Sequence, residues 1–369
     1  MGNKSVLQPQ ATEARRAVVV NFDNVFHNSR RLREFAAANA FENVRNTMAN
    51  GMKGFFGKIL APEEFIERMR KADKDDENFA NLRAFSALSP LANSPKEHYS
   101  LMLAIEGRPV LAESAAKGDR KSIARLKQTL DNSQTRNLPE REAFAVFFQS
   151  FLSGRAYTKE ANFMGMDALE MTCQYEPLMK LNEPIAGAYR HLSALQNSAT
   201  IYFSTQGSPE FAGLICTAWE AWIGDVVPAA RGKFNSIRTE GILDAQINGP
   251  FPINIPTDLG LLLAEDGSAK LFSNHQFRDR MLSIDDGDRI KHMQLAAERE
   301  RLPYENIWLL DGSYNKRAFA ALHESSFHNL VVVENNPARA WNYAEARRDG
   351  VPVVKMDGAP ADASRLLTK

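Results

Sequence analysis

The feature that most constrains this chain is a series of short, continuous apolar runs, each bounded by polar or turn-forming residues. Strands of a parallel sheet that are buried on both faces have this form, whereas half-exposed strands alternate apolar and polar residues. The runs are AVVV (17–20), ATIYF (199–203), NIWLL (306–310), NLVVV (329–333) and VPVV (351–354). They predict strands of one parallel sheet.

Helical stretches follow several of these runs. SPEFAGLICTAWEAW (208–222), YNKRAFAALHESS (314–326) and PARAWNYAEARRDG (337–350) come after the second, third and fourth runs. A strand, a turn, a helix and a further strand make the βαβ unit of parallel sheets. We therefore predict an α/β fold with a doubly wound, mainly parallel, Rossmann-like sheet.

Residues 30–180 carry a different pattern. Helical periodicity, broken by Pro, Gly and Ser, runs through segments such as PEEFIERMRKA (62–72) and PEREAFAVFFQSFLSG (139–154), and strand signals are scarce. This pattern predicts a large helical domain at 30–180, inserted after the first strand, in the place where the family discussed below has its cap. The α/β core domain would then consist of residues 1–29 and 181–369.

Composition limits the classes of partner. The 369 residues carry a formal net charge of zero, which gives no electrostatic reason to expect nucleic acid. No window reaches the ~20 apolar residues of a membrane span, and the N-terminus lacks the apolar region of a secretory signal. Cys173 and Cys216 have no metal-ligand spacing. We expect a cytoplasmic protein with no nucleic-acid partner and no membrane span.

The first apolar run leads into NFDNVFHNS (21–29). This segment resembles the first motif of the haloacid dehalogenase superfamily of phosphatases and phosphotransferases, an apolar strand followed by Asp-x-Asp-Gly-(Thr/Val). Asn21 stands at the first aspartate, Asp23 at the second and Asn24 at the glycine. The departure from the family pattern is Asn21.

The second and third motifs of that family have matches in the same order. The second is a strand that ends in Ser or Thr, and it matches ATIYFST through Ser204, with Thr205 as the alternative. The third is a lysine ahead of the fourth strand. Lys291 has the spacing and context for it, and Lys270 is the alternative.

The fourth motif is a strand that ends in an acid, with another acid a few residues later. LLDGSYN resembles it, with Asp311 at the first position and Asn315 at the later one. Glu334, after the run at 329–333, is a competing acid, but the spacing from Lys291 favours Asp311. The resemblance covers residues 17–29 and roughly 180–355.

The resemblance implies phosphohydrolase chemistry on a phosphorylated small molecule or a phosphoprotein. In such a site the first carboxylate attacks phosphorus, and the second acid protonates the leaving oxygen and activates water. A Ser or Thr hydroxyl and a lysine, here Ser204 and Lys291, hold the phosphoryl oxygens. The implied Mg²⁺ would be bound at the positions of Asn21, Asp23, Asp311 and Asn315, with Asp23 contributing its backbone carbonyl.

Asn21 weakens this scheme, because a carboxamide is neither a useful nucleophile nor a strong ligand for Mg²⁺. One hypothesis is an impaired enzyme in which Asp23 does the acid-base work. The other is a non-catalytic relative that binds a phosphorylated ligand or a protein. A third hypothesis is that Asn21 is an engineered substitution that traps substrate.

Each motif also has a plain structural interpretation. Ser204 and Thr205 would suit the cap of a following helix, Lys291 a solvated helix start, and Asp311 a turn before glycine. The order of the four motifs along a βαβ pattern favours the resemblance.

Overall fold

The computed structural model describes residues 15–50, 61–71, 77–92, 94–134, 139–152, 180–185, 188, 191–192, 195, 198–205, 212, 281–283 and 289–356. Within these ranges the predicted α/β character is confirmed, since a parallel sheet is combined with many helices. Lys270, the segment 245–275 and nearly all of the helix expected at 208–222 lie outside the described residues.

A six-stranded sheet has the order β5-β4-β1-β6-β7-β8, and all of its strand pairs are parallel. Its strands are β1 (Ala17–Asn21), β4 (Thr200–Thr205), β5 (Met281–Ser283), β6 (Ile307–Asp311), β7 (Asn329–Val333) and β8 (Val353–Val354). The five apolar runs are thus strands. The sequence did not predict β5. Because the chain adds strands on both sides of β1, the sheet is doubly wound from its centre.

Burial on both faces explains the continuous apolar runs. Every residue of β6 and β7 is buried, and so are the first four residues of β1. After β1 the chain makes the tight turn η1 (Phe22–Phe26) and enters β2 (His27–Asn28), which pairs antiparallel with β3 (Glu183–Pro184).

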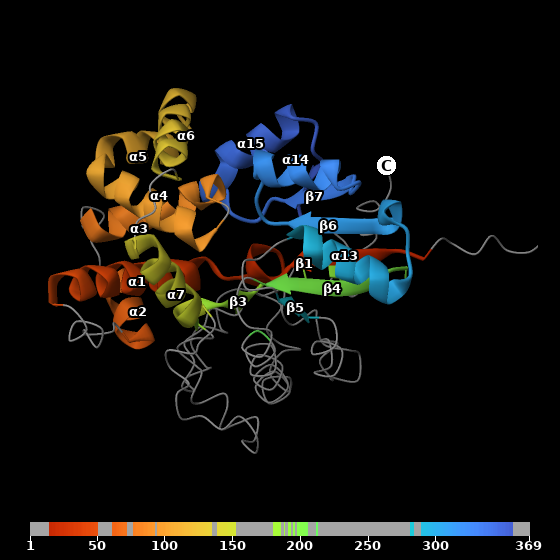
Figure 1. Ribbon diagram of the computed structural model, residues 1–369, viewed down its shortest axis with the longest axis horizontal. Helices are drawn as coiled ribbons and strands as arrows, with labels where there is room; N and C mark the ends of the chain where they lie inside the picture. The colour runs from red at the N-terminus through yellow and green to blue at the C-terminus, as the bar shows by residue number, and fades with distance from the viewer. Residues whose placement is uncertain are drawn as a thin grey trace, which may run out of the picture.

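Helices of the chain segment between β1 and β4 lie beyond the carboxyl ends of β4 and β6 (Figure 1). Proline begins four of them, a position where its missing N–H costs nothing. Ser94 caps one of these by accepting a hydrogen bond from the Glu97 backbone N–H. The helices are α1 (Arg30–Asn50), α2 (Pro62–Lys71), α3 (Glu77–Leu88), α4 (Pro95–Gly107), α5 (Pro109–Ala116), α6 (Arg120–Gln134) and α7 (Pro139–Leu152), with the short turn η3 (Ser89–Leu91) after α3.

Three further helices in the described ranges follow β5, β6 and β7 in the chain, and the last two match the helical stretches predicted at 314–326 and 337–350. They are α13 (Arg289–Glu300), α14 (Lys316–Glu324) and α15 (Ala340–Arg348), with the short turns η5 (Tyr304–Asn306) and η6 (Pro337–Arg339). None of the helices in the described ranges is both long and apolar enough to cross a membrane.

Two apolar clusters form the core. On one face of the sheet, Ala17 and Val19 pack with Met293, Phe319 and other residues of α13, α14 and α15. On the other face, Val18 and Val20 belong to a cluster that continues into the helices α1–α7. The sheet and these helices therefore share apolar contacts, and the division at 30–180 stays a prediction.

Candidate functional site

The carboxyl ends of three neighbouring strands bring Asn21, Ser204 and Asp311 to one edge of the sheet, which we call the mouth. Asn21 ends β1 and lies in register with Ser204 of β4. On the other side, Val20 lies in register with Leu310 of β6, so Asn21 and Asp311 come next to each other. The carboxyl ends of parallel strands lie at the same edge of a sheet, so the strand order alone places these three residues close together.

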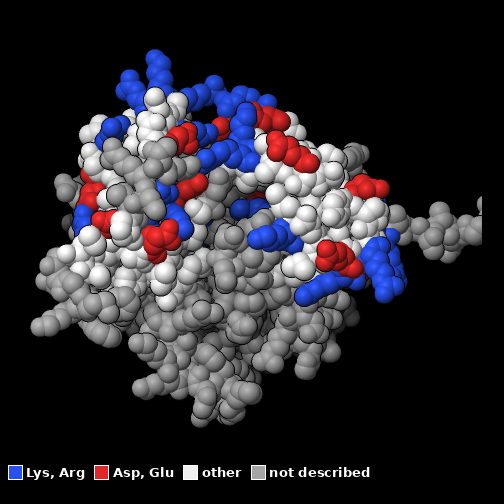
Figure 2. Space-filling view, viewed as in Figure 1, with Lys and Arg blue, Asp and Glu red and all other residues white. Residues whose placement is uncertain are grey.

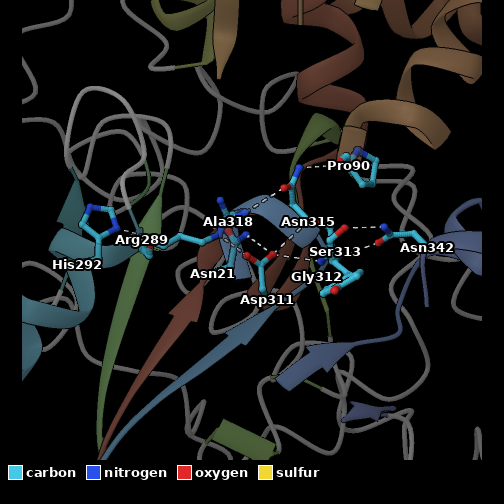
Figure 3. Close-up of polar contacts among 12 residues, drawn as sticks. Asn21, Pro90, Arg289, His292, Asp311, Gly312, Ser313, Asn315, Ala318 and Asn342 are labelled. Carbon is cyan, nitrogen blue, oxygen red and sulfur yellow. Dashed lines mark hydrogen bonds and ion pairs between the residues drawn. The ribbon is translucent and has the colours of Figure 1, made fainter. Parts of the chain in front are cut away.

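Asp311 is the centre of the polar contacts at the mouth (Figure 3). Its carboxylate has no exposed surface. One oxygen, Oδ1, accepts hydrogen bonds from Asn21 Nδ2 at 2.9 Å and from the Ser313 backbone N–H at 3.1 Å. The other, Oδ2, forms an ion pair with Arg289 Nε. Both oxygens of this carboxylate are therefore already hydrogen-bonded.

Asp23 lies buried in η1, within reach of a side chain from the end of β4. Thr205 Oγ1 donates a hydrogen bond to Asp23 Oδ2 at 3.1 Å. The next residue, Asn24, has a φ of 78°, and asparagine tolerates this left-handed conformation better than most residues. The loop after β6 passes so close that a Cβ on Gly312 would lie 2.6 Å from the Asn24 carbonyl oxygen.

Ser204 is bound to a histidine that the sequence analysis did not assign. A hydrogen bond of 2.5 Å joins Ser204 Oγ to Nδ1 of His292, which is fully buried on α13. Thr205, not Ser204, contacts Asp23. The two hydroxyl groups that were alternatives for the second motif thus have different partners.

Arg289 forms a hydrogen-bonded ion pair with Asp311, the acid of the fourth motif, and this residue was not predicted from the sequence. Lys291 lies on α13 as well, but its side chain is exposed. Helical spacing was the signal that separates them: Arg289 is four residues from the buried Met293 and seven from the buried Ala296, so it shares their face. The role of Lys291 at the site stays a prediction.

Asn315 has a structural role at the beginning of α14. Its Oδ1 accepts a hydrogen bond from the Ala318 backbone N–H at 3.1 Å, which caps the helix. Its Nδ2 donates to the Pro90 carbonyl of η3 at 2.9 Å (Figure 3). Both ends of the amide are therefore engaged away from Asp311.

A second guanidinium group lies close enough to interact electrostatically with this cluster. Burial lowers the pKa of Arg33 on α1 from its ordinary value, and the positive charge of Arg289 lowers it further. The carboxylates of Asp23 and Asp311 oppose that shift. Arg33 therefore lies within electrostatic range of both acids and of Arg289.

The donor set, as it is arranged, does not fit the Mg²⁺ that the resemblance implies. Mg²⁺ requires near-octahedral oxygen ligands. Asn21 directs its amide nitrogen at Asp311, and the second oxygen of Asp311 pairs with Arg289. Among the described residues, no group of three His, Cys, Asp or Glu side chains is arranged to hold a metal.

A pocket of about 210 Å³ lies apart from the mouth, between α6 and the segment that leads into α14. Asn315 is the one predicted site residue that lines it. Basic side chains gather over this region (Figure 2), but those at the pocket are paired: Lys127 with Glu345, Lys316 with Asp349, and Arg317 with Glu97 and Asp131. The pocket therefore offers little net attraction for an anion.

No family model matches the chain, and no curated protein or solved structure matches it either. The function must therefore be argued from the chemistry of the site residues.

Proposed function

We propose that this chain is a scaffold of the haloacid dehalogenase type that binds a phosphorylated ligand at the mouth, and that its standard phosphoryl-transfer reaction is impaired. The ligand is a phosphorylated small molecule or a phosphoprotein. Helices α1–α7 would act as the cap that selects it. The position agrees with the general rule that open α/β sheets bind ligands at the carboxyl ends of their strands.

The hydrogen bond from Asn21 Nδ2 to Asp311 Oδ1 carries this proposal. At the position where the family has its nucleophilic carboxylate, Asn21 presents an amide N–H to the acid of the fourth motif. A carboxamide oxygen has no full negative charge and does not form an acyl phosphate readily. Asn21 therefore acts as a hydrogen-bond donor at the mouth and not as a nucleophile.

Two further observations support the assignment of the first motif. Asn24 has a left-handed φ of 78° at the position where the family pattern has glycine. Asp23, at the position of the second acid, accepts a hydrogen bond from Thr205 at the end of β4, where the second motif supplies its hydroxyl group. Asp23 and the end of β4 thus lie beside each other, as the order of the first two motifs would require.

A non-catalytic binding module is the second candidate, and Asn315 favours it. Where the family pattern has a further acid, Asn315 uses both ends of its amide to cap α14 and to bind η3. Asn21 and Asn315 both stand where the family pattern has a carboxylate. A site that binds a ligand but no longer needs to turn it over would be expected to lose such carboxylates.

The experiment is hydrolysis of a generic aryl phosphate with Mg²⁺ by the unaltered chain, Asn21→Asp and Asn315→Asp. We expect little turnover by the unaltered chain and a large increase for Asn21→Asp, because loss of a covalent nucleophile commonly costs on the order of 10⁴ in rate. Asn315→Asp is the control for added charge, since it keeps a good helix cap and supplies no nucleophile.

Strong Mg²⁺-dependent turnover by the unaltered chain, abolished by Asp23→Ala, would show that catalysis is not impaired. It would make Asp23 the principal catalytic group. Absence of turnover in all variants, together with retained binding of a phosphorylated ligand, would favour the binding module.

A further inference from the structure

The ion pair between Arg289 and Asp311 places a positive charge where the family resemblance implies a metal ion. Asp311 has no exposed surface, and the Arg289 side chain is 18% exposed. A fully buried carboxylate costs free energy unless both of its oxygens have hydrogen-bond partners. Here Asn21 and Ser313 supply those partners to the other oxygen of Asp311.

Two guanidinium groups lie near the acids of the mouth. Arg289 pairs with Asp311, and the carboxylates of Asp23 and Asp311 both lie close enough to Arg33 to influence its pKa. A divalent cation that bound Asp311 would have to displace Arg289 and then remain beside two positive groups.

Arg289 also keeps donors for a ligand. Its Nε is used in the ion pair, and its terminal Nη groups make no hydrogen bond to any residue in the described ranges. A guanidinium group holds its donors in a planar fork that matches the oxygens of a phosphoryl group. The partial exposure of the side chain leaves a route for a ligand to reach it.

We propose that Arg289 takes the place of the divalent cation at this mouth, so that the site binds a phosphoryl group without a metal ion. This inference rests on the proposed function, because it assumes a phosphorylated ligand at the mouth. It goes further by naming the group that supplies the positive charge, and by replacing the expected Mg²⁺ dependence with dependence on one arginine.

The test is calorimetric binding of inorganic phosphate to the full chain, once with EDTA and once with Mg²⁺. We expect the same affinity, within about twofold, in both conditions. Arg289→Gln should weaken binding at least tenfold, because a charge-assisted hydrogen bond contributes about 1.5–3 kcal/mol and 1.4 kcal/mol is tenfold in affinity.

Matched variants keep the test decisive. Arg299→Gln removes one positive charge from the exposed side of the same helix, and it should bind phosphate as the unaltered chain does. Arg289→Gln leaves Asp311 without its ion pair and could fail to fold. In that case Arg289→Lys is the variant to test, because it keeps the positive charge but lacks the planar fork of donors. We expect it to fold and to bind phosphate more weakly than the unaltered chain.

The outcomes separate this inference from the function on which it rests. Binding that appears only with Mg²⁺, or equal binding by a folded Arg289→Gln, would overturn the role of Arg289 and leave the phosphate-binding function in place. Absence of binding in both conditions would overturn the proposed function, and the inference with it.

Discussion

Asn21 Nδ2 donates a hydrogen bond to Oδ1 of Asp311 across the ends of the neighbouring strands β1 and β6, at 2.9 Å. An ionised carboxylate only accepts hydrogen bonds, so the amide must direct its nitrogen at Asp311. The residue that departs from the family pattern is thus also one that satisfies a fully buried acid. We therefore expect that replacing it by aspartate, the residue of the family that the motif resembles, changes the stability of the fold.

Asn21→Asp should lower the free energy of unfolding near pH 7. The change removes a donor to Asp311 and sets two carboxylates against each other, with an expected loss of about 2 kcal/mol. Like charges raise the pKa of such a pair above the unfolded value. The loss should therefore be small at about pH 4, where the pair holds a proton, and should grow as pH rises through the raised pKa.

Urea unfolding of the variant and of the unaltered chain at both pH values measures this difference. Asn315→Asp loses the hydrogen bond from Nδ2 to the Pro90 carbonyl, but it adds its charge at a helix cap and not beside Asp311, so its loss at pH 7 should be smaller. An equal loss at both pH values would contradict charge repulsion as the cause. Added Mg²⁺ should restore stability to Asn21→Asp and leave the unaltered chain unchanged.

Gly312→Ala should destabilise the fold by about 1–3 kcal/mol, because the new Cβ would lie 2.6 Å from the Asn24 carbonyl oxygen and the backbone would have to move. Gly107→Ala is the control, since no atom lies within 4 Å of its added Cβ. That change, at the end of α4, should be neutral or slightly stabilising. Thermal unfolding measures the stability of both variants. Similar changes in the two would contradict the close contact between Gly312 and the Asn24 carbonyl oxygen.

Arg339→Met should destabilise the fold by about 2–4 kcal/mol. The Arg339 guanidinium is buried, which lowers its pKa to about 10. It donates to Ser89 Oγ at 2.8 Å and to the Ser86 carbonyl at 3.4 Å, both near the end of α3, and to the Gly312 carbonyl at 3.5 Å. The arginine thus joins the helices of the 30–180 segment to the loop after β6.

The control for this prediction is Arg348→Met, on the exposed surface of α15, which should change stability by less than about 1 kcal/mol. Denaturant unfolding measures both variants. A small effect of Arg339→Met would mean that the contacts between α3 and the loop after β6 contribute little to the fold.

The stability of the chain should fall as pH is lowered, because two buried histidines resist protonation. Burial lowers the pKa values of His27 and His98 to about 3, and Arg33 and Arg339 contribute to the shift at His98. Both groups are neutral in the folded and unfolded chain at pH 7. Below about pH 6.5 the unfolded chain takes up protons first, so stability is lost as pH falls toward 3.

The expected loss is about 2 kcal/mol per histidine between about pH 7 and pH 5. His98→Phe, which suits an aromatic setting between Phe85 and Phe148, should reduce the slope of unfolding free energy against pH in this window. His323→Gln, at an exposed position of α14, should not change it. If His98→Phe leaves this slope unchanged, His98 is not one of the groups that make stability depend on pH.

The strands could be predicted because their signal is local. A run such as AVVV at 17–20 or NLVVV at 329–333 is apolar throughout when both faces of its strand are buried, and this pattern needs no knowledge of the partner strands. The placement of Asn21, Ser204 and Asp311 at one edge follows from it, since parallel strands end together. β5, with its three residues Met281–Ser283, is too short to give such a signal.

The side-chain partners at the mouth were decided by tertiary structure. Arg289 and Lys291 are two residues apart, and the choice between them depends on which face of α13 packs against the sheet. Arg33 and Arg289, which belong to helices far apart in the sequence, both lie near Asp311. Strand formation depends on neighbouring residues, whereas the orientation of a helix depends on everything that packs against it. For that reason the sequence by itself determined where the mouth lies, and only the folded chain decided which charges meet there.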